Sequence, residues 1–241
     1  MIKKFLLPLI KHQSPFFAGN GPARVFCISM QRTGTTSVGK FFRDFGFRWA
    51  GWPSDEKNNW SDRWYDGAYE EIFSSEDFVN ANAYEDSPWW LPDFYKVLYQ
   101  RFSNAKFILF TRDPDAWFAS MLNHSGGDII GRGRIHCKVY RRELEYFNLL
   151  HSGLINEETE DQLYSAKKMK ITGYQEHYKE IYQLHNTEVQ DFFRKHAPGS
   201  LYVGKLEDPD KWKKLGSFLG VKIPDNYKNH ENASQVSGNS T

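Results

Sequence analysis

The chain has 241 residues, of which 40% are hydrophobic and 17% aromatic, so it can bury a sizeable, ring-rich core and is not disordered by composition. Its formal net charge is only +1, which argues against a general nucleic-acid binder. Two cysteines, Cys27 and Cys137, are too few for a disulfide scaffold and indicate reduced thiols in a cytoplasmic protein.

The N-terminus, MIKKFLLPLI, starts with basic residues and an apolar run, which is a pattern that can mark a signal sequence. The run from Phe5 to Ile10 contains a proline and has only six residues, fewer than a signal core or a membrane span requires. No other segment of the sequence reaches spanning length. We therefore expect no membrane span and a cytoplasmic location.

The first half of the chain predicts alternating strands and helices. The stretch ARVFCIS predicts a buried strand, and VGKFFRDFG predicts a helix that ends at Gly46. The polar, tryptophan-rich stretch from Trp49 to Trp64 is interpreted as a loop or irregular segment. The sequence DGAYEEIF then predicts a short helix, and DFVNANAYEDSP predicts a strand that runs out at Pro88.

The second half continues the alternation. LPDFYKVLYQRF predicts an amphipathic helix, AKFILFTRD the strongest strand of the chain, and DAWFASML the helix after it. Residues 123–170 contain scattered glycines and several basic residues, and they are hard to assign to helices or strands. A long helix is predicted over 173–195, followed by a strand at SLYVGK and a last helix at DKWKKLGSFLG.

Strands separated by helix-length segments imply parallel pairing, with helices on both faces of the sheet. No internal repeat, low-complexity tract or linker divides the chain. The sequence therefore predicts one α/β domain over residues 1–241, in three layers, with a central parallel sheet flanked by helices.

The stretch SMQRTGTTSVGKFF is similar to a phosphate-binding loop, but it has no lysine after Gly34. A strand that enters a tight turn and then a helix directs backbone N–H groups at an anion. Arg32 adds a guanidinium suited to oxyanions, and hydroxyl donors follow at Thr35, Thr36 and Ser37. The loop is able to bind phosphate or sulfate without being an ATP site, and the alternative is an ordinary strand-turn-helix with a Gly/Thr-rich turn.

A second motif, TRDPDAWFAS, stands at the end of the strongest predicted strand. Ligands of open parallel sheets bind beyond the carboxyl ends of the strands, where Arg112 is expected. Ser120 follows eight residues later, on the next helix. Both residues also fit a purely structural helix start, but beside the first loop they form a second anion site facing the first.

Three stretches together, MQRTGTTS, FILFTRDPDAWFAS and LGVKIPDNYKNHEN, resemble the sulfotransferases that use 3′-phosphoadenosine 5′-phosphosulfate (PAPS). The resemblance covers about residues 24–232 and is strongest to the bacterial-type branch with an RTGTTS loop. It implies a three-layer P-loop sulfotransferase-like fold. It also implies transfer of a sulfuryl group to a hydroxyl or amine of an unidentified acceptor, with release of adenosine 3′,5′-bisphosphate and no metal.

The resemblance assigns the 5′-phosphosulfate to the first loop and the 3′-phosphate to the second motif. The 5′-phosphosulfate residues are Arg32, Thr33, Gly34, Thr35, Thr36 and Ser37, and the 3′-phosphate residues are Arg112 and Ser120. The RKGxxG signature of the arylsulfotransferase branch is absent, so its adenosine contacts are not carried over. Lys205 and Trp212 lie in the right part of the chain, but equally fit a surface cation and a core ring. His230 and Asn232 match the ending of the bacterial-type branch only in part.

Sulfuryl transfer requires in-line geometry, stabilisation of charge on the moving group and removal of the acceptor proton. Arg32 is the candidate for the second task. For the third, the branch carries an Asp followed two residues later by Pro, which matches Asp86 in YEDSPWW. Asp86 also fits a helix-capping role, and Glu85 and His124 remain alternative bases, His124 being four residues after Ser120.

The acceptor is much less defined by the sequence. The tryptophans between Trp49 and Trp90 suit sugar rings or phenols, but more often form a core. The basic stretch GRGRIHCKVYRR suits an anionic acceptor or, more commonly, a solvated face. A P-loop small-molecule kinase and a non-catalytic nucleotide-binding protein remain the alternative functions. The oligomeric state is not predicted.

Overall fold

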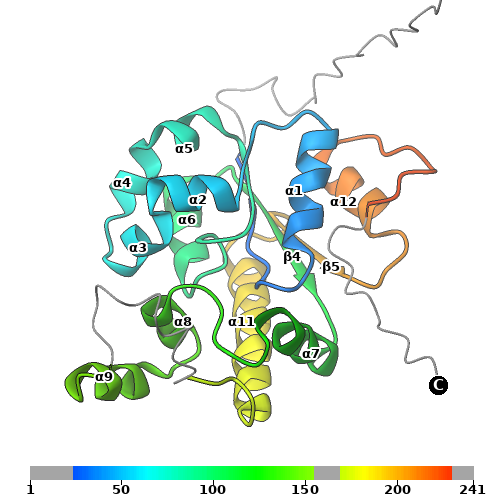
Figure 1. The fold of residues 1–241 in the computed structure, drawn as a ribbon. Coiled ribbons are helices and arrows are strands. Elements are labelled where there is room, and N and C mark those ends of the chain that lie inside the picture. Colours follow the sequence, from blue (N-terminus) through cyan, green and yellow to red (C-terminus); the bar gives the residue numbers. More distant parts are fainter. Residues whose placement is uncertain (1–23, 155–168, 230–241) are drawn as a thin grey trace, which may run out of the picture.

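The structure is a computed structural model, and it describes residues 24–154 and 169–229 (Figure 1). The expectations for MIKKFLLPLI, His230 and Asn232 lie outside these residues. Among the helices of the described ranges, none combines the length and the apolar character needed to cross a bilayer.

The described strands form one parallel sheet in the order β2-β3-β1-β4-β5. They are β1 (Val25–Cys27), β2 (Trp49–Ala50), β3 (Ala83–Tyr84), β4 (Lys106–Thr111) and β5 (Leu201–Lys205). Val25 of β1 is in register with Ala83 of β3 on one side and with Lys106 of β4 on the other. The prediction of a central parallel sheet is confirmed.

The side chains of β1 alternate between two cores, one on each face of the sheet. Val25 and Cys27 pack with Phe41 of α1 (Thr35–Asp44) and with Trp212 of α12 (Lys211–Leu219), and Figure 1 shows these two helices side by side. Phe26 belongs to the larger core on the opposite face. Burial of both faces by helices gives the expected three layers.

The remaining described helices follow the predicted order in most places. They are α2 (Trp52–Asn58), α3 (Trp60–Tyr65), α4 (Tyr69–Ser74), α5 (Glu76–Asn80), α6 (Phe94–Arg101), α7 (Pro114–Ser125), α8 (Gly133–Val139), α9 (Glu143–His151) and α11 (Gln175–His196). Five predicted helices correspond to observed ones, namely 66–73 to α4, 91–102 to α6, 115–122 to α7, 173–195 to α11 and 210–220 to α12. The first predicted helix, α1, begins three residues earlier than expected, at Thr35.

The prediction of an irregular segment from Trp49 to Trp64 is wrong, because it contains β2, α2 and α3. Pro53 lies in the first turn of α2, where a proline is tolerated. Asn59 adopts a left-handed φ of +51° that ends α2 and starts α3. The buried Asp55 joins the two helices by accepting hydrogen bonds from the amide and hydroxyl of Ser61, both at 2.7 Å.

The prediction of a strand over DFVNANAYEDSP is only partly correct. Residues Glu76–Asn80 form α5, and the strand is limited to Ala83–Tyr84. The acidic residues Glu76 and Asp77 lie in the first turn of α5, where they favour a helix through its dipole. Phe78 of this helix packs on Tyr84 with ring centroids 4.9 Å apart, so one short amphipathic turn replaces the expected strand.

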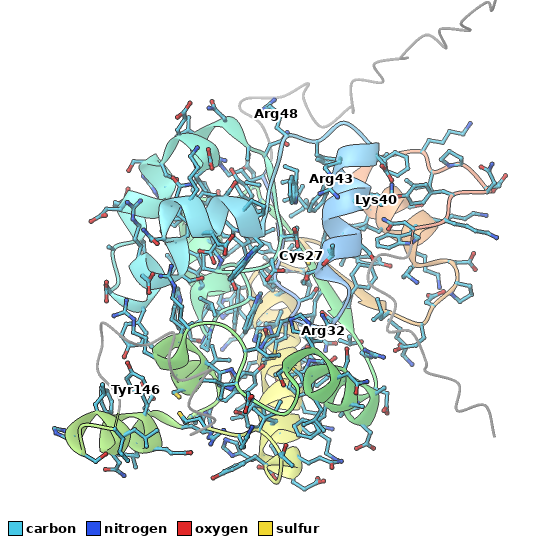
Figure 2. All side chains as sticks on the ribbon, viewed as in Figure 1. Cys27, Arg32, Lys40, Arg43, Arg48 and Tyr146 are labelled. Atoms are coloured by element: carbon cyan, nitrogen blue, oxygen red, sulfur yellow. The ribbon has the colours of Figure 1, made fainter. Side chains whose placement is uncertain are left out.

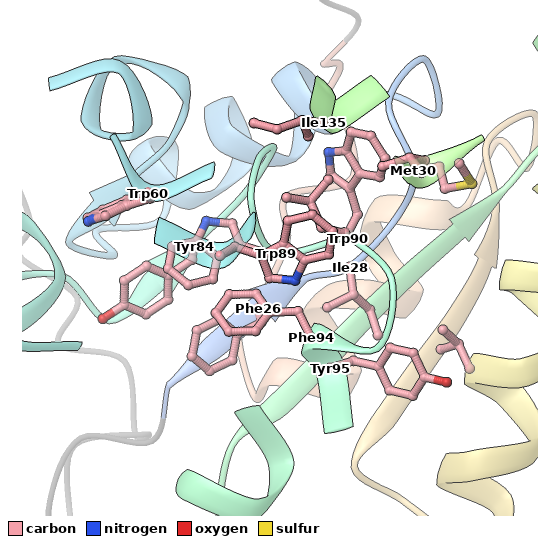
Figure 3. Close-up of a cluster of buried hydrophobic side chains, with 14 of the residues drawn as sticks. Phe26, Ile28, Met30, Trp60, Tyr84, Trp89, Trp90, Phe94, Tyr95 and Ile135 are labelled. Carbon is pink, nitrogen blue, oxygen red and sulfur yellow. The ribbon is translucent and has the colours of Figure 1, made fainter. Parts of the chain in front are cut away.

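The larger core is dense in aromatic rings, as Figure 3 shows around Phe26. The ring of Phe26 lies 4.8 Å from that of Tyr84 and 5.4 Å from that of Trp89, centroid to centroid. Trp60 packs edge-on against Trp89. The core interpretation of the tryptophans therefore holds for most of them, since Trp60, Trp64, Trp89 and Trp90 are buried.

The segment after α12 returns to α1 and fastens its first turn. Trp212 donates its indole N–H to the carbonyl of Asn229 at 3.1 Å. The buried Asn229 side chain donates through Nδ2 to the carbonyl of Ser37, at 2.7 Å, and to the hydroxyl of Tyr227, at 3.0 Å. Because Ser37 lies in the first turn of α1, this contact holds the helix end that borders the candidate site.

We expect Asn229→Ala to lower the free energy of unfolding by about 1–3 kcal/mol, because buried acceptors on α1 and Tyr227 lose their donor. The measurement is equilibrium urea unfolding. Asn226→Ala, at an exposed position of the same segment, is the matched control and should change stability by less than about 0.5 kcal/mol. Equal effects of the two variants would contradict a specific role for Asn229.

Candidate active site

The candidate site lies at the sheet edge where the parallel strands end. The loop of residues 28–34 follows β1, Asp86 follows β3, and Arg112 follows β4. Since β3 and β4 both pair with β1, these three segments are neighbours at one edge. The sheet order therefore brings together the two sequence motifs and the predicted base.

The loop after β1 is held in a conformation that depends on Gly34. This residue precedes α1 with a φ of +86°, a left-handed conformation that favours glycine. A Cβ at this position would lie 2.6 Å from Cδ1 of Leu206. The buried Thr33 donates its hydroxyl to the carbonyl of Met30, which closes the turn internally.

The two motifs are joined directly by a hydrogen bond between side chains. Arg32 donates through Nε to Oγ of Ser120 at 3.2 Å, and the Ser120 side chain is buried on α7. Figure 2 shows Arg32 between the N-terminal end of α1 and α7. Arg32 itself has a φ of +67°, an uncommon conformation for a residue with a side chain. This strained loop residue is thus held by its contact with the second motif.

Arg112 is positioned through its backbone by Tyr182 of α11. The Tyr182 hydroxyl accepts a hydrogen bond from the Arg112 amide at 2.7 Å and donates one to the Arg112 carbonyl at 3.1 Å. The Tyr182 ring stacks on Trp117, with centroids 4.4 Å apart. The guanidinium Nε lies 3.6 Å from Oε1 of Glu207, which follows β5.

The two guanidinium groups repel each other across the site. Burial and then the charge of Arg112 lower the pKa of Arg32, and the carboxylate of Asp86 opposes this shift. Arginine nevertheless stays charged at any ordinary pH. An anion placed between the two groups relieves the repulsion, so the arrangement favours binding of an oxyanion.

Asp86 faces the start of α1, which follows the loop after β1. Its Oδ2 accepts a hydrogen bond from the hydroxyl of Thr35 at 3.4 Å, and its Oδ1 accepts one from the amide of Ser87 at 2.9 Å. Burial raises the pKa of Asp86, although both hydrogen bonds oppose the rise. Asp86 also has a φ of +67°. Strained backbone at the end of a strand is typical of functional positions.

Of the two alternative bases, Glu85 is enclosed away from the solvent. Its Oε1 accepts a hydrogen bond from the Trp49 indole at 3.2 Å, and Oε2 has no hydrogen-bond partner within the described ranges. A Cβ on Gly39 or on Gly51 would lie 2.8 or 2.3 Å from Oε1. Glu85 is therefore packed against the middle of α1, one helical turn beyond Thr35, and is 3% exposed.

His124, the other alternative, lies closer to the charged groups of the site. It follows Ser120 by one turn on α7, which extends to Ser125, so the two residues share a helix face as expected. Partial burial and the charge of Arg32 lower the pKa of His124, while Asp86 opposes the shift. At neutral pH the imidazole is neutral and able to accept a proton.

The remaining residues that the sequence singled out differ in their exposure. Thr36 is exposed, and Ser37 is buried with its carbonyl bonded to Asn229. Lys205 is exposed at the end of β5. Trp212 is a core ring, since it is 5% exposed and stacks on Phe41 at 5.5 Å, so the structure gives no support to its suggested contact with adenosine.

Three of the cations of the stretch GRGRIHCKVYRR contact residues of α3. Arg132 and Arg134 both form ion pairs with Asp62 of α3. Lys138 lies over the rings of Trp64 and Tyr65, 4.7 and 4.5 Å from their centroids. These contacts fasten α8 to α3, and they argue against the suggestion that this stretch attracts an anionic acceptor.

The two sequence motifs are also contacted by three residues that were not predicted, Tyr182, Leu206 and Glu207. The positions of Leu206 and Glu207 directly after β5 carry a signal that could have predicted them as site residues, because ligands bind at the carboxyl ends of parallel strands. The position of Tyr182 carries no such signal, since it lies within a long helix among other aromatic residues.

Both cysteines are free and buried, and burial raises the pKa of the Cys27 thiol to about 12.

The fold and the site define an α/β protein whose sheet edge carries two guanidinium groups and a raised-pKa carboxyl group. A family model described as a sulfotransferase domain matches residues 24–236, and the chain belongs to this sulfotransferase family. No match is found among curated proteins. Among solved structures, a sulfotransferase from Alicyclobacillus acidocaldarius is similar at 15% identity, with 88% of each chain covered and a TM-score of 0.48.

We expect Glu85→Gln to change the pH dependence of stability. Burial, with a contribution from Asp86, raises the pKa of Glu85 well above its usual value. The folded state therefore binds this proton more tightly, and wild-type stability falls as pH rises from about 4.3 towards the folded pKa. Glutamine removes this loss, so the variant should gain at least about 1 kcal/mol relative to wild type between pH 4 and pH 8.

The measurement is urea unfolding at several pH values. Glu56→Gln, at an exposed position of α2, is the matched control and should give the wild-type profile. A parallel shift of the Glu85→Gln curve at all pH values would show that Glu85 does not titrate differently on folding.

Proposed function

We propose that this sulfotransferase-family protein takes its sulfuryl group from PAPS and transfers it to a hydroxyl or amine of an acceptor. The observation that carries the proposal is the hydrogen bond between Arg32 and Ser120. It brings the loop after β1 and the motif after β4 into one site with two neighbouring positive charges. A donor with phosphate groups at both the 5′ and 3′ positions requires two such anion sites.

The proposed roles follow the two motifs. The loop residues bind the 5′-phosphosulfate, through backbone N–H groups at the start of α1 and the guanidinium of Arg32. α1 has no acidic residue in its first turn, so none there opposes an anion. Arg112 and Ser120 bind the 3′-phosphate. Thr33 and Gly34 shape the loop rather than supply its charge.

Asp86 is the proposed general base. The acceptor oxygen attacks sulfur, the bond from sulfur to the bridging phosphate oxygen breaks, and the acceptor proton moves to the Asp86 carboxylate. Adenosine 3′,5′-bisphosphate is the leaving group, and Arg32 stabilises the charge that develops on the transferring group. A base whose pKa is raised towards neutrality is better suited to this proton transfer than an ordinary aspartate.

The acceptor side of the site is bounded by β2 and β3. Trp52, directly after β2 and Gly51, is 43% exposed, in contrast to the buried tryptophans of the core. An exposed indole after β2, the strand that pairs with β3, fits a ring-containing acceptor, such as a glycan or a phenol, although small alcohols also satisfy the chemistry.

Adenosine 3′,5′-bisphosphate should raise the thermal midpoint of the wild-type protein by about 5–10 °C at a concentration near 100 times its Kd. The same concentration of AMP, which lacks the 3′-phosphate, should raise it much less. Arg112→Ala should weaken bisphosphate binding about 10- to 100-fold and leave AMP binding unchanged, since only the 3′-phosphate loses its partner.

The matched control is Arg194→Ala, whose side chain is 79% exposed on α11 and should change neither affinity. Equal losses for both nucleotides in Arg112→Ala would contradict the assignment of the 3′-phosphate. Stabilisation by ATP with magnesium, without stabilisation by the bisphosphate, would instead favour a small-molecule kinase.

Asp86→Asn should lower sulfuryl transfer about 100-fold or more, because the variant cannot take the acceptor proton. Its bisphosphate-induced rise in thermal midpoint should be retained. The measurement is transfer from radiolabelled PAPS to a panel of phenols, alcohols and saccharides. The wild-type rate should increase with pH as Asp86 loses its proton.

His124→Gln is the comparison variant, because His124 is the other group near both Arg32 and Asp86. A larger loss in His124→Gln than in Asp86→Asn would transfer the role of base to the histidine. Bisphosphate binding without transfer to any acceptor would favour the non-catalytic nucleotide-binding alternative.

A further inference from the structure

The segment after β5 contacts both anion motifs, although neither motif lies in this part of the sequence. The Leu206 amide donates to the carbonyl of Thr111 at 2.8 Å, which places the ends of β5 and β4 together. The Leu206 side chain covers Gly34, and the next residue, Glu207, forms an ion pair with Arg112.

The ion pair between Glu207 and Arg112 is long, and its two side chains differ in their exposure to solvent. Nε of Arg112 lies 3.6 Å from the Glu207 carboxylate, which is beyond a hydrogen bond, and this buried Nε has no hydrogen-bond partner in the described part of the chain. The side chain of Glu207 is 57% exposed, whereas that of Arg112 is 26% exposed. The carboxylate therefore approaches the guanidinium from the solvent side and can move away without disturbing the core.

Glu207 has a second cation close to it. Burial lowers the pKa of Lys211 at the start of α12, and the charge of Glu207 opposes this shift. A carboxylate displaced from Arg112 therefore remains in a favourable field near Lys211. Arg112, in contrast, faces the repulsion of Arg32 and requires an anion.

We infer that Glu207 is an internal competitor for the anion-binding guanidinium of Arg112, and that it sets the affinity and selectivity for the 3′-phosphate. This inference rests on the proposed function. A phosphate dianion can displace the carboxylate because it carries more charge and three acceptor oxygens, whereas a weaker anion cannot. The competition weakens binding of the product bisphosphate, which carries the same 3′-phosphate, and so favours its release.

Glu207→Gln tests the inference, because it keeps the size of the side chain and removes the competing charge. The expected result is about fivefold or greater tightening for adenosine 3′,5′-bisphosphate and no change for AMP, measured by isothermal titration calorimetry. The tightening should disappear in the Arg112→Ala background. Glu188→Gln, at an exposed position of α11, controls for the change in net charge and should match wild type.

The outcomes separate the inference from the proposed function. If wild type prefers the bisphosphate to AMP but Glu207→Gln binds it no more tightly, the inference is wrong and the function stands. Equal tightening for both nucleotides, or tightening that persists without Arg112, also overturns it. If wild type shows no preference for the 3′-phosphate, the proposed function fails, and the inference fails with it. Weaker binding together with a lower thermal midpoint would show that Glu207 only supports the loop.

Discussion

The hydrogen bond from Arg32 to Ser120 is the contact on which the geometry of the site depends. A second hydrogen bond lies one residue earlier in the loop, where Trp117 of α7 donates its indole N–H to the carbonyl of Gln31 at 2.9 Å. α7 is therefore fastened at two points to the loop after β1, a loop that contains a left-handed arginine. Since α7 directly follows Arg112, the same contacts set the distance between the two guanidinium groups. A change in this helix would displace both proposed anion sites together.

Each guanidinium group of the site has one carboxyl group near it, although the two guanidinium groups still repel each other. Arg32 lies in the field of Asp86, and Arg112 lies beside Glu207. Each cation therefore has a nearby carboxyl group whose charge can be withdrawn when an anion binds. The Asp86 carboxylate can take a proton, and the Glu207 side chain can move into solvent. In the proposed function, an anionic donor takes the place of these internal partners instead of meeting either an unpaired cluster of cations or a neutral surface.

Local patterns predicted the parts of the fold and the site that depend on neighbouring residues. Apolar runs predicted β1 and β4, the loop pattern after β1 singled out Arg32, and the rule that ligands bind at strand ends singled out Arg112. The segment from Trp49 to Trp64 was missed because a tertiary contact, between Asp55 and Ser61, stabilises polar helices that look irregular in sequence. The role of Glu207 was missed for a related reason, since it depends on a partner from another strand.

The distribution of charge also separates the two halves of the sheet edge. At and next to α8, Arg132 and Arg134 pair with Asp62 of α3, and Lys138 lies over the rings of Trp64 and Tyr65. Arg32 and Arg112 lie in the segments that follow β1 and β4. The side of β2 and β3 offers a carboxyl group, Asp86, and an exposed indole, Trp52. In the proposed function, recognition by charge therefore belongs to the donor, and we expect an acceptor that is selected by shape and by its reach to Asp86.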